Sequence, residues 1–301
     1  MMHSDPDAGV GARSPLQVPP EGWLAVLKRT WAETGEDNIG LIAAGIAFYA
    51  FAAIVPLLAS VVLSYGLFAA PETVQRNIEG IFSALPQDAA RIVSEQLLSV
   101  VESSADKQGL GLLLALVIAL YGATKGASAI VTGLNVAYDT KETRGFVHAN
   151  LINFAIVGGG VVLIIIAMLA TALIGFVEAL APGAPTMLLI LIRILGYLLL
   201  AALVASGASA LYFVGPAVDQ PRWRWLSPGS IGATVLWLAG TSLFGIYVTN
   251  FGNYGATYGS LSAVIVLLTW LWLSAYVFLL GAELNAELER QVDGSAADIS
   301  R

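Results

Sequence analysis

The chain has 301 residues, of which 57% are hydrophobic and 12% are charged, with a mean hydropathy of +0.78; soluble domains carry about 25% charged residues, so an ordinary water-soluble protein is excluded. The net charge of −7 argues against nucleic acid as a partner, because binding to phosphate groups needs a basic surface. The absence of cysteine excludes disulfides, thiolate catalysis and cysteine-based metal sites.

Two segments precede the first apolar stretch, and neither has the form of a cleavable signal peptide. Residues 1–20 are polar and rich in Pro, and we expect them to form a disordered cytoplasmic tail. Residues 21–37 predict an amphipathic helix at the membrane interface, with a helix on a soluble surface as the alternative. The apolar face of this helix consists of Trp23, Leu24, Leu27 and Trp31.

Six apolar segments follow, each long enough for a helix that crosses a bilayer core of about 30 Å. They cover about 39–70, 109–137, 149–177, 186–214, 228–250 and 260–283. The last two lie within residues 225–282, which hold 58 consecutive positions without a charged side chain. The expected fold is therefore an all-α polytopic membrane protein with six transmembrane helices.

The remaining segments define the domain limits and the orientation. Residues 71–108 have apolar side chains at helical spacing and predict an amphipathic outer segment between the first two spans. The transmembrane domain is expected over residues 38–289, and residues 290–301 are expected to form a second cytoplasmic tail. With both termini in the cytoplasm, the inner segments hold nine Lys and Arg and the outer segments three, as the positive-inside rule requires.

Two blocks of the sequence resemble a known family. Residues 43–51, AAGIAFYAF, followed by Pro56, are similar to the opening signature of the YihY/BrkB family. Residues 253–261, NYGATYGSL, lead into 270–274, WLWLS, and 281–287, GAELNAE, which resemble the closing block of that family. This is the membrane family long labelled ribonuclease BN.

The resemblance covers about Trp23 to Glu289 and implies a six-helix protein of the bacterial inner membrane with a suspected role in transport. Its old label can be tested against the residues, because a metal-dependent nuclease needs clustered His, Asp and Glu. The chain has two histidines, His3 and His148, and no H-x-H-x-D-H run, Walker A loop or G-x-S-x-G elbow. We therefore expect no enzyme and no cofactor.

Lys125 is the first candidate for a functional polar residue at membrane depth. It lies about 15 residues into the second span, which is roughly 22 Å from the outer surface. A charge there costs at least about 2.5–3.5 kcal/mol, so it usually faces a partner or a water-filled cavity. Lys125 is expected to contact an anion or a lipid phosphate, or to pair with Glu283; the alternative is a lysine that extends to the inner interface. Gly122 and Gly126 beside it predict close packing against another helix.

Glu283, at the cytoplasmic end of the last span, is the second candidate, and it is followed by Asn285. Glu287 lies on the same helical face as Glu283 but is expected to be solvated. Arg193 lies about seven residues into the fourth span, roughly 10 Å from the outer surface. We expect its side chain either to extend to the outer lipid headgroups or to line an outward-facing vestibule.

Other residues predict a polar path, a point of mobility and close helix packing. The side chains that could line the path are Tyr49, Asn253, Tyr254 and Tyr258, for each of which packing is the alternative. Pro56 predicts a kink in the first span. Two groups of small residues, Gly158–Gly160 and Ser206–Ala210, predict close approach between helices.

These features favour a transporter of a small solute or lipid, driven by a gradient or by a partner ATPase. The alternative is a non-transporting scaffold or envelope-integrity protein. The expected partners are membrane lipids and a small-molecule or lipid substrate, and a homo-oligomer remains open.

Overall fold

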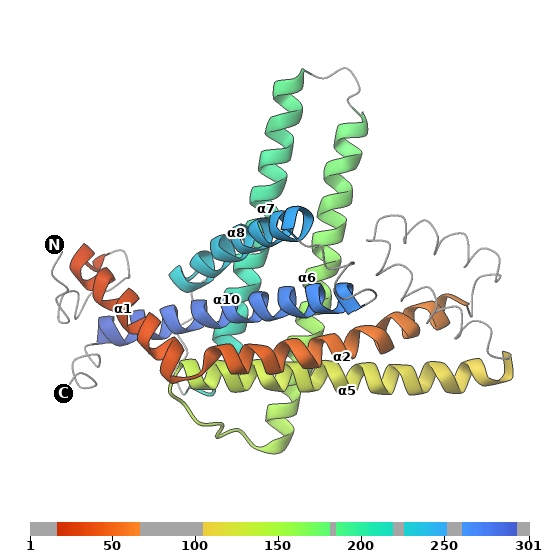
Figure 1. Ribbon diagram of the computed structural model, residues 1–301, viewed down its shortest axis with the longest axis horizontal. Coiled ribbons are helices and arrows are strands. Elements are labelled where there is room, and N and C mark those ends of the chain that lie inside the picture. The colour runs from red at the N-terminus through yellow and green to blue at the C-terminus, as the bar shows by residue number, and fades with distance from the viewer. Residues whose placement is uncertain (1–16, 67–104, 181–184, 219–225, 252–260, 294–301) are drawn as a thin grey trace. The chain divides into compact units, whose positions relative to one another are not determined.

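The computed structural model describes residues 17–66, 105–180, 185–218, 226–251 and 261–293. Seven α-helices occupy these ranges (Figure 1). Their bounds are Pro20–Glu36 (α1), Ile39–Gly66 (α2), Ala105–Ala137 (α5), Phe146–Leu180 (α6), Thr186–Val214 (α7), Pro228–Phe251 (α8) and Ser262–Asp293 (α10). The all-α fold predicted from the sequence is confirmed. The outer segment 71–108, apart from its last four residues, and most of the two predicted tails lie outside the described residues.

Five of the helices, α5, α6, α7, α8 and α10, are long and apolar enough to cross a membrane. The number rises to six if α1 and the first part of α2, Ile39–Ile54, form one broken span. Large apolar side chains such as Ile165, Met187 and Leu198 are exposed on these helices. Exposed apolar surface on this scale fits lipid tails rather than water, so the prediction of a polytopic membrane protein is confirmed.

The chain divides into two compact units. The first unit consists of Met1–Ile42, Ile130–Ala239 and Tyr276–Arg301. It contains α1, α6 and α7, together with the end of α5, the first half of α8 and the second half of α10. The second unit consists of Ala43–Ala129 and Gly240–Ala275.

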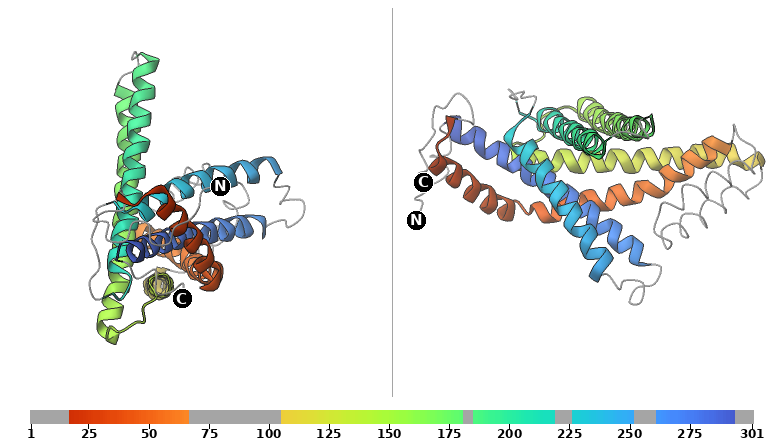
Figure 2. Two further views of the ribbon diagram at one scale, coloured as in Figure 1. Left: turned by 90° about the vertical axis from the view of Figure 1, so that its left-hand side faces the viewer. Right: turned by 90° about the horizontal axis from the view of Figure 1, so that it is seen from above.

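Within the first unit, α6 and α7 lie side by side along their length (Figures 1 and 2). The absence of a side chain at Gly207 permits this approach, because a Cβ atom there would lie 2.7 Å from Cδ1 of Leu163. The prediction for the Ser206–Ala210 group is thus confirmed. The prediction for Gly158–Gly160 is wrong for the part of the chain that the structure describes, because no described atom lies within 4 Å of a Cβ atom at these glycines.

Within the second unit, α5 packs closely on α2 at the predicted G-x-x-x-G step. A Cβ atom at Gly122 would lie 3.0 Å from the Cβ of Ala53, and one at Gly126 would lie 3.8 Å from the Cβ of Tyr49. Small residues at this spacing let two helix backbones approach each other. Pro56 lies inside α2, and the kink expected from it stays a prediction.

The ends of α1 and α5 use the same type of cap. Asn38 and Asp139 adopt positive φ angles of 54° and 48°, a left-handed conformation that Asn and Asp tolerate better than other side chains. Equivalent backbone bonds close both ends, from Asn38 N–H to Gly35 O and from Asp139 N–H to Val136 O. These caps fix where the chain leaves each helix.

Candidate functional site

The second half of α10 carries a series of buried polar side chains. Glu283, Glu287 and Gln291 follow at intervals of four residues on one face, and their exposed fractions are 0%, 1% and 0%. Asn285, on another face, is 6% exposed. The expectation that Glu287 is solvated is wrong, because α1 covers this face of α10 (Figure 2). Glu287 was expected to be solvated because it lies beyond the last apolar residue of the predicted span. The helix nevertheless continues to Asp293 through strong helix formers.

A charge cluster, which we define as Arg29, Asp139, Glu287, Arg290 and Gln291, joins α1, α10 and the end of α5. Nε of Arg29 lies 2.6 Å from Oε2 of Glu287, and its Nη2 donates to Oε1 of Gln291 at 2.5 Å. Arg290 donates to the other oxygen of Glu287 and lies 2.6 Å from Oδ2 of Asp139. Both oxygens of Glu287 are therefore occupied by guanidinium groups, as a buried charge requires.

Glu283 is one turn of α10 away and differs from Glu287 in its surroundings. Both of its carboxyl oxygens are buried, and neither has a hydrogen-bond partner within the described part of the chain. The charged groups that act on it are Asp37, Arg290 and Glu33. A buried polar group without a partner is rare and costly, so Glu283 needs a functional or chemical explanation.

A serine–asparagine cluster, which we define as Ser209, Ser227, Ser230 and Asn285, lies where α7 and α10 meet the start of α8. Oδ1 of Asn285 accepts from Gly229 N–H at 2.9 Å, and its Nδ2 donates to Oγ of Ser227 at 2.8 Å. Ser209 donates to Oγ of Ser230 at 2.7 Å. These groups bind the otherwise unpaired amides at the N-terminus of α8.

The same region contains the closest approach between α8 and α10. A Cβ atom at Gly229 would collide with the carbonyl oxygen of Gly281, and one at Gly281 would lie 2.6 Å from the hydroxyl oxygen of Tyr212. That hydroxyl donates to the carbonyl oxygen of Phe278 at 2.6 Å. The absence of side chains at Gly229 and Gly281 therefore lets α7, α8 and α10 pack closely around the serine–asparagine cluster.

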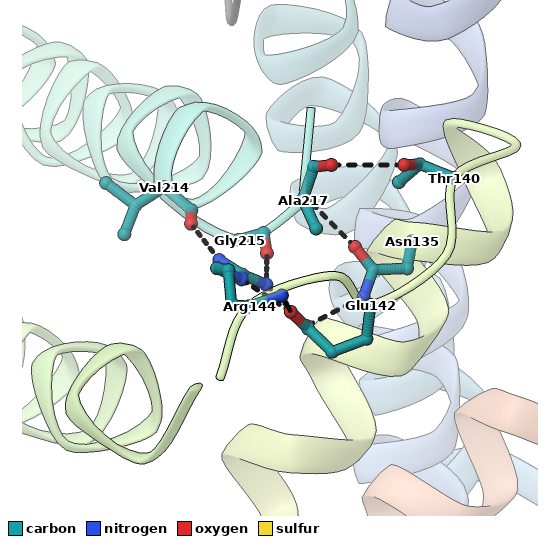
Figure 3. A network of polar contacts seen from close by, with 7 residues as sticks. All are labelled: Asn135, Thr140, Glu142, Arg144, Val214, Gly215 and Ala217. Carbon is teal, nitrogen blue, oxygen red and sulfur yellow. Dashed lines mark hydrogen bonds and ion pairs between the residues drawn. The ribbon is translucent and has the colours of Figure 1, made fainter. Parts of the chain in front are cut away.

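A third polar network connects the α5–α6 link to the end of α7 (Figure 3). Arg144 donates to both carboxyl oxygens of Glu142 at 2.7 Å and to the carbonyl oxygen of Gly215 at 2.8 Å. Asn135 accepts from Ala217 N–H at 2.7 Å. A cation at a helix C-terminus also interacts favourably with the helix dipole. The link is thus held at both ends.

Glu142 predicts a specific pH dependence of stability. Its hydrogen bonds from Arg144 lower the pKa of the carboxyl group to about 2. Because the folded pKa lies below the unfolded value of about 4.3, the carboxylate stabilises the fold above that pH, and this contribution is lost as the pH falls toward 2. We expect Glu142→Gln to lower the Tm at neutral pH and to approach the wild type in acid. Parallel Tm profiles over this range would contradict the assignment.

The structure distributes the predicted site residues between the two units. Glu283 and Asn285 lie in the first unit, Asn285 in the serine–asparagine cluster and Glu283 one turn of α10 from the charge cluster. Lys125 lies in the second, exposed on α5, with Nζ 5.5 Å from the ring centroid of Tyr121. The pairing of Lys125 with Glu283 therefore stays a prediction.

Five further candidates are exposed or lie outside the described residues. Arg193 is exposed on α7 in the first unit, and Tyr49 is exposed on α2 in the second. Asn253, Tyr254 and Tyr258 lie outside the residues that the structure describes. The polar path therefore stays a prediction.

Several residues of the clusters were not singled out from the sequence. Arg29 is separated from Glu287 by 258 positions, and Asn135 from Ala217 by 82. Ser209 and Ser227 look like ordinary small residues of a membrane bundle. The only signal for them was Asn285, an amide that must find a partner once it is buried.

Comparison with known proteins decides the family. The model of the family described as virulence factor BrkB matches residues 30–300. The chain belongs to the BrkB family. The ribonuclease-like protein YfkH of Bacillus subtilis is 30% identical over 219 residues, which cover 71% of this chain and 79% of YfkH. A UPF0761 membrane protein of Alteromonas mediterranea is 28% identical over 272 residues, which cover 87% of each chain. No solved structure matches.

The resemblance seen in the sequence is thereby confirmed, together with its membrane character. The ribonuclease-like name belongs to YfkH, and the BrkB family description contains no enzymatic activity. Within the described ranges, no group of three or more His, Asp or Glu side chains could hold a metal ion. His148 is exposed on α6.

Proposed function

We propose that this BrkB-family chain is a transporter, not an enzyme, and that it moves a small solute or a lipid across the bacterial inner membrane. One observation carries the proposal: an apolar helix, α10, holds Glu283, Asn285, Glu287 and Gln291 almost fully buried. Ionisable groups within membrane spans are costly, and they commonly mark substrate or ion pathways. The serine–asparagine and charge clusters, together with Glu283, form the proposed polar site.

A scaffold is the second candidate, because the charge cluster by itself could serve only assembly. Against it stands Glu283, whose buried oxygens accept no hydrogen bond from any residue that the structure describes. A purely structural site would be more stable with an apolar side chain at this position. The proposal further includes membrane lipids as partners, no nucleic acid, and a homo-oligomer as the assembly to be tested.

The proposed transporter has both termini in the cytoplasm, with nine Lys and Arg inside and three outside. We expect a green fluorescent protein fused after Arg301 to fluoresce and an alkaline phosphatase fused at the same point to be inactive. Reversal of both signals would contradict this orientation. Phosphatase fusions in the predicted outer loop at 251–259 provide the matched control and should be active.

Flux through reconstituted protein tests the function itself. Liposomes of phosphatidylethanolamine and phosphatidylglycerol are loaded with a bacterial metabolite extract and carry a fluorescent phosphatidylethanolamine. Mass spectrometry detects solute efflux, and dithionite quenching detects lipid movement. We expect one of the two to exceed the rate in protein-free liposomes, and to fall in Lys125→Gln or Glu283→Gln protein that folds normally.

Matched variants keep the flux experiment specific. Lys141→Gln and Glu21→Gln remove the same charges from exposed side chains and should leave flux unchanged. If neither solute nor lipid crosses faster than in empty liposomes, the transporter proposal fails. If the wild type shows no flux and the Lys125→Gln or Glu283→Gln protein loses stability, the scaffold is favoured.

A further inference from the structure

Glu283 occupies a position that assembly alone does not explain. Its side chain is fully buried, and its two oxygens accept no hydrogen bond from any described residue. Glu287, one turn later on the same face, shows what a structural carboxylate looks like here, because Arg29 and Arg290 bind both of its oxygens. The contrast identifies Glu283 as a carboxyl group that is kept buried without a permanent partner.

The side chain within hydrogen-bonding reach of Glu283 is another carboxyl group, that of Asp37. Asp37 follows the last residue of α1, next to the left-handed Asn38. Two carboxylates are both acceptors, so they cannot form a hydrogen bond with each other. One added proton turns either group into a donor and completes the bond.

The balance of charge around the pair also favours uptake of a cation. The titratable and charged groups that face it are Glu33, Glu36 and Arg29 from α1, Tyr138 and Asp139 from the α5–α6 link, and Glu287 and Arg290 from α10. With Asp37 and Glu283 included, six carboxyl groups face two guanidinium groups. Two carboxyl groups within hydrogen-bonding reach suit a proton, which binds one oxygen and lets that group donate to the other.

Water reaches Asp37 at the junction of α1 and α2, because this residue is only half-buried. A cavity of about 360 Å³ lies there, lined by Trp31, Thr34, Gly35, Asn38, Gly40, Leu41 and Tyr276. Two of these residues, Gly35 and Asn38, lie within two positions of Asp37. The volume is ample for several water molecules, and the lining offers hydroxyl and amide groups to hold them.

We propose that Glu283 and Asp37 form a proton-binding pair and that the proton is the ion to which transport is coupled. The pair takes up one proton from water at the cavity, forming an O–H bond on one carboxyl group that donates to the other. Release breaks this bond and returns the proton to water, so no other reactant is needed. The coupling role rests on the proposed transport function, whereas proton binding does not.

Difference infrared spectroscopy of the full-length protein in phosphatidylethanolamine–phosphatidylglycerol vesicles tests proton binding directly. We expect the wild type to show the C=O band of a buried, protonated carboxylic acid that disappears as the pH is raised. The band should be lost in Glu283→Gln and shifted in Asp37→Asn. Glu21→Gln, which removes an exposed carboxylate from α1, should leave it unchanged.

Two results would overturn the proton-binding pair: no such band in the wild type at any pH, or the same band in Asp37→Asn as in the wild type. The second variant keeps the test decisive if Glu283→Gln fails to fold. Flux without the band would reject the pair and leave the transporter intact. The band without flux, in the liposome assay above, would support the pair and reject transport.

Discussion

Replacing Glu287 by alanine is expected to destabilise the protein by about 3–5 kcal/mol. The side chain is 2% exposed and holds two guanidinium groups, so its removal leaves Arg29 and Arg290 partly buried with fewer partners. Breaking a buried ion pair by removal of one partner costs this much because the remaining charge stays desolvated. Thermal unfolding in detergent, followed by the fluorescence of the seven tryptophans, measures the loss as a lower Tm.

Two variants show whether the effect of Glu287→Ala comes from the buried ion pairs. Glu36→Ala removes an exposed glutamate from the end of α1 and should change stability by no more than about 0.5 kcal/mol. Glu287→Gln keeps the shape and one acceptor and should fall between the two. Equal Tm values for Glu287→Ala and Glu36→Ala would show that the charge cluster contributes nothing to the fold.

Gly229→Ala is expected to cost about 1–3 kcal/mol or to prevent folding, although it adds one methyl group. The new Cβ atom would meet the backbone oxygen of Gly281, which cannot rotate away, and would lie 2.7 Å from Oδ1 of Asn285. The α8–α10 crossing must therefore open, and the bond from Gly229 N–H to Asn285 would lengthen. The Tm and the yield of monodisperse protein in detergent measure this.

Gly158→Ala is the matched control for Gly229→Ala. It lies inside α6 with nothing within 4 Å of the added Cβ atom, and alanine is favoured over glycine in a helix by about 1 kcal/mol. We therefore expect Gly158→Ala to keep or raise the Tm. A fall in Tm that is as large for Gly158→Ala as for Gly229→Ala would contradict the proposed close crossing.

The spans and the family could be predicted from the sequence, because both depend on local signals. Each apolar stretch specifies its own helix within the membrane, whatever the other helices do. The closing block around 281–287 identified the BrkB family by residue order alone. The G-x-x-x-G step at Gly122 likewise predicted close packing, although not which helix would fill it.

The polar clusters could not be predicted, because they join positions that lie far apart in the chain. Nothing near Arg29 indicates that its partner is Glu287, and the turn at Asp139 gives no sign that it meets Arg290. Glu287 was misjudged for the same reason: burial by α1 is a tertiary effect that the apolar pattern of α10 does not contain. Glu283 could be recognised without any knowledge of its neighbours in space, because a carboxylate directly after Gly281 and Ala282 is unusual.

The most direct test of the central claim, that the polar site on α10 binds what the protein transports, is native mass spectrometry of protein extracted gently from membranes. We predict that the wild type retains a lipid or a small solute, and that Asn285→Ala and Glu283→Gln proteins of normal Tm lose it. Glu36→Gln should retain it. If the variants carry the same molecules in the same proportion as the wild type, the site does not bind substrate and the account is wrong.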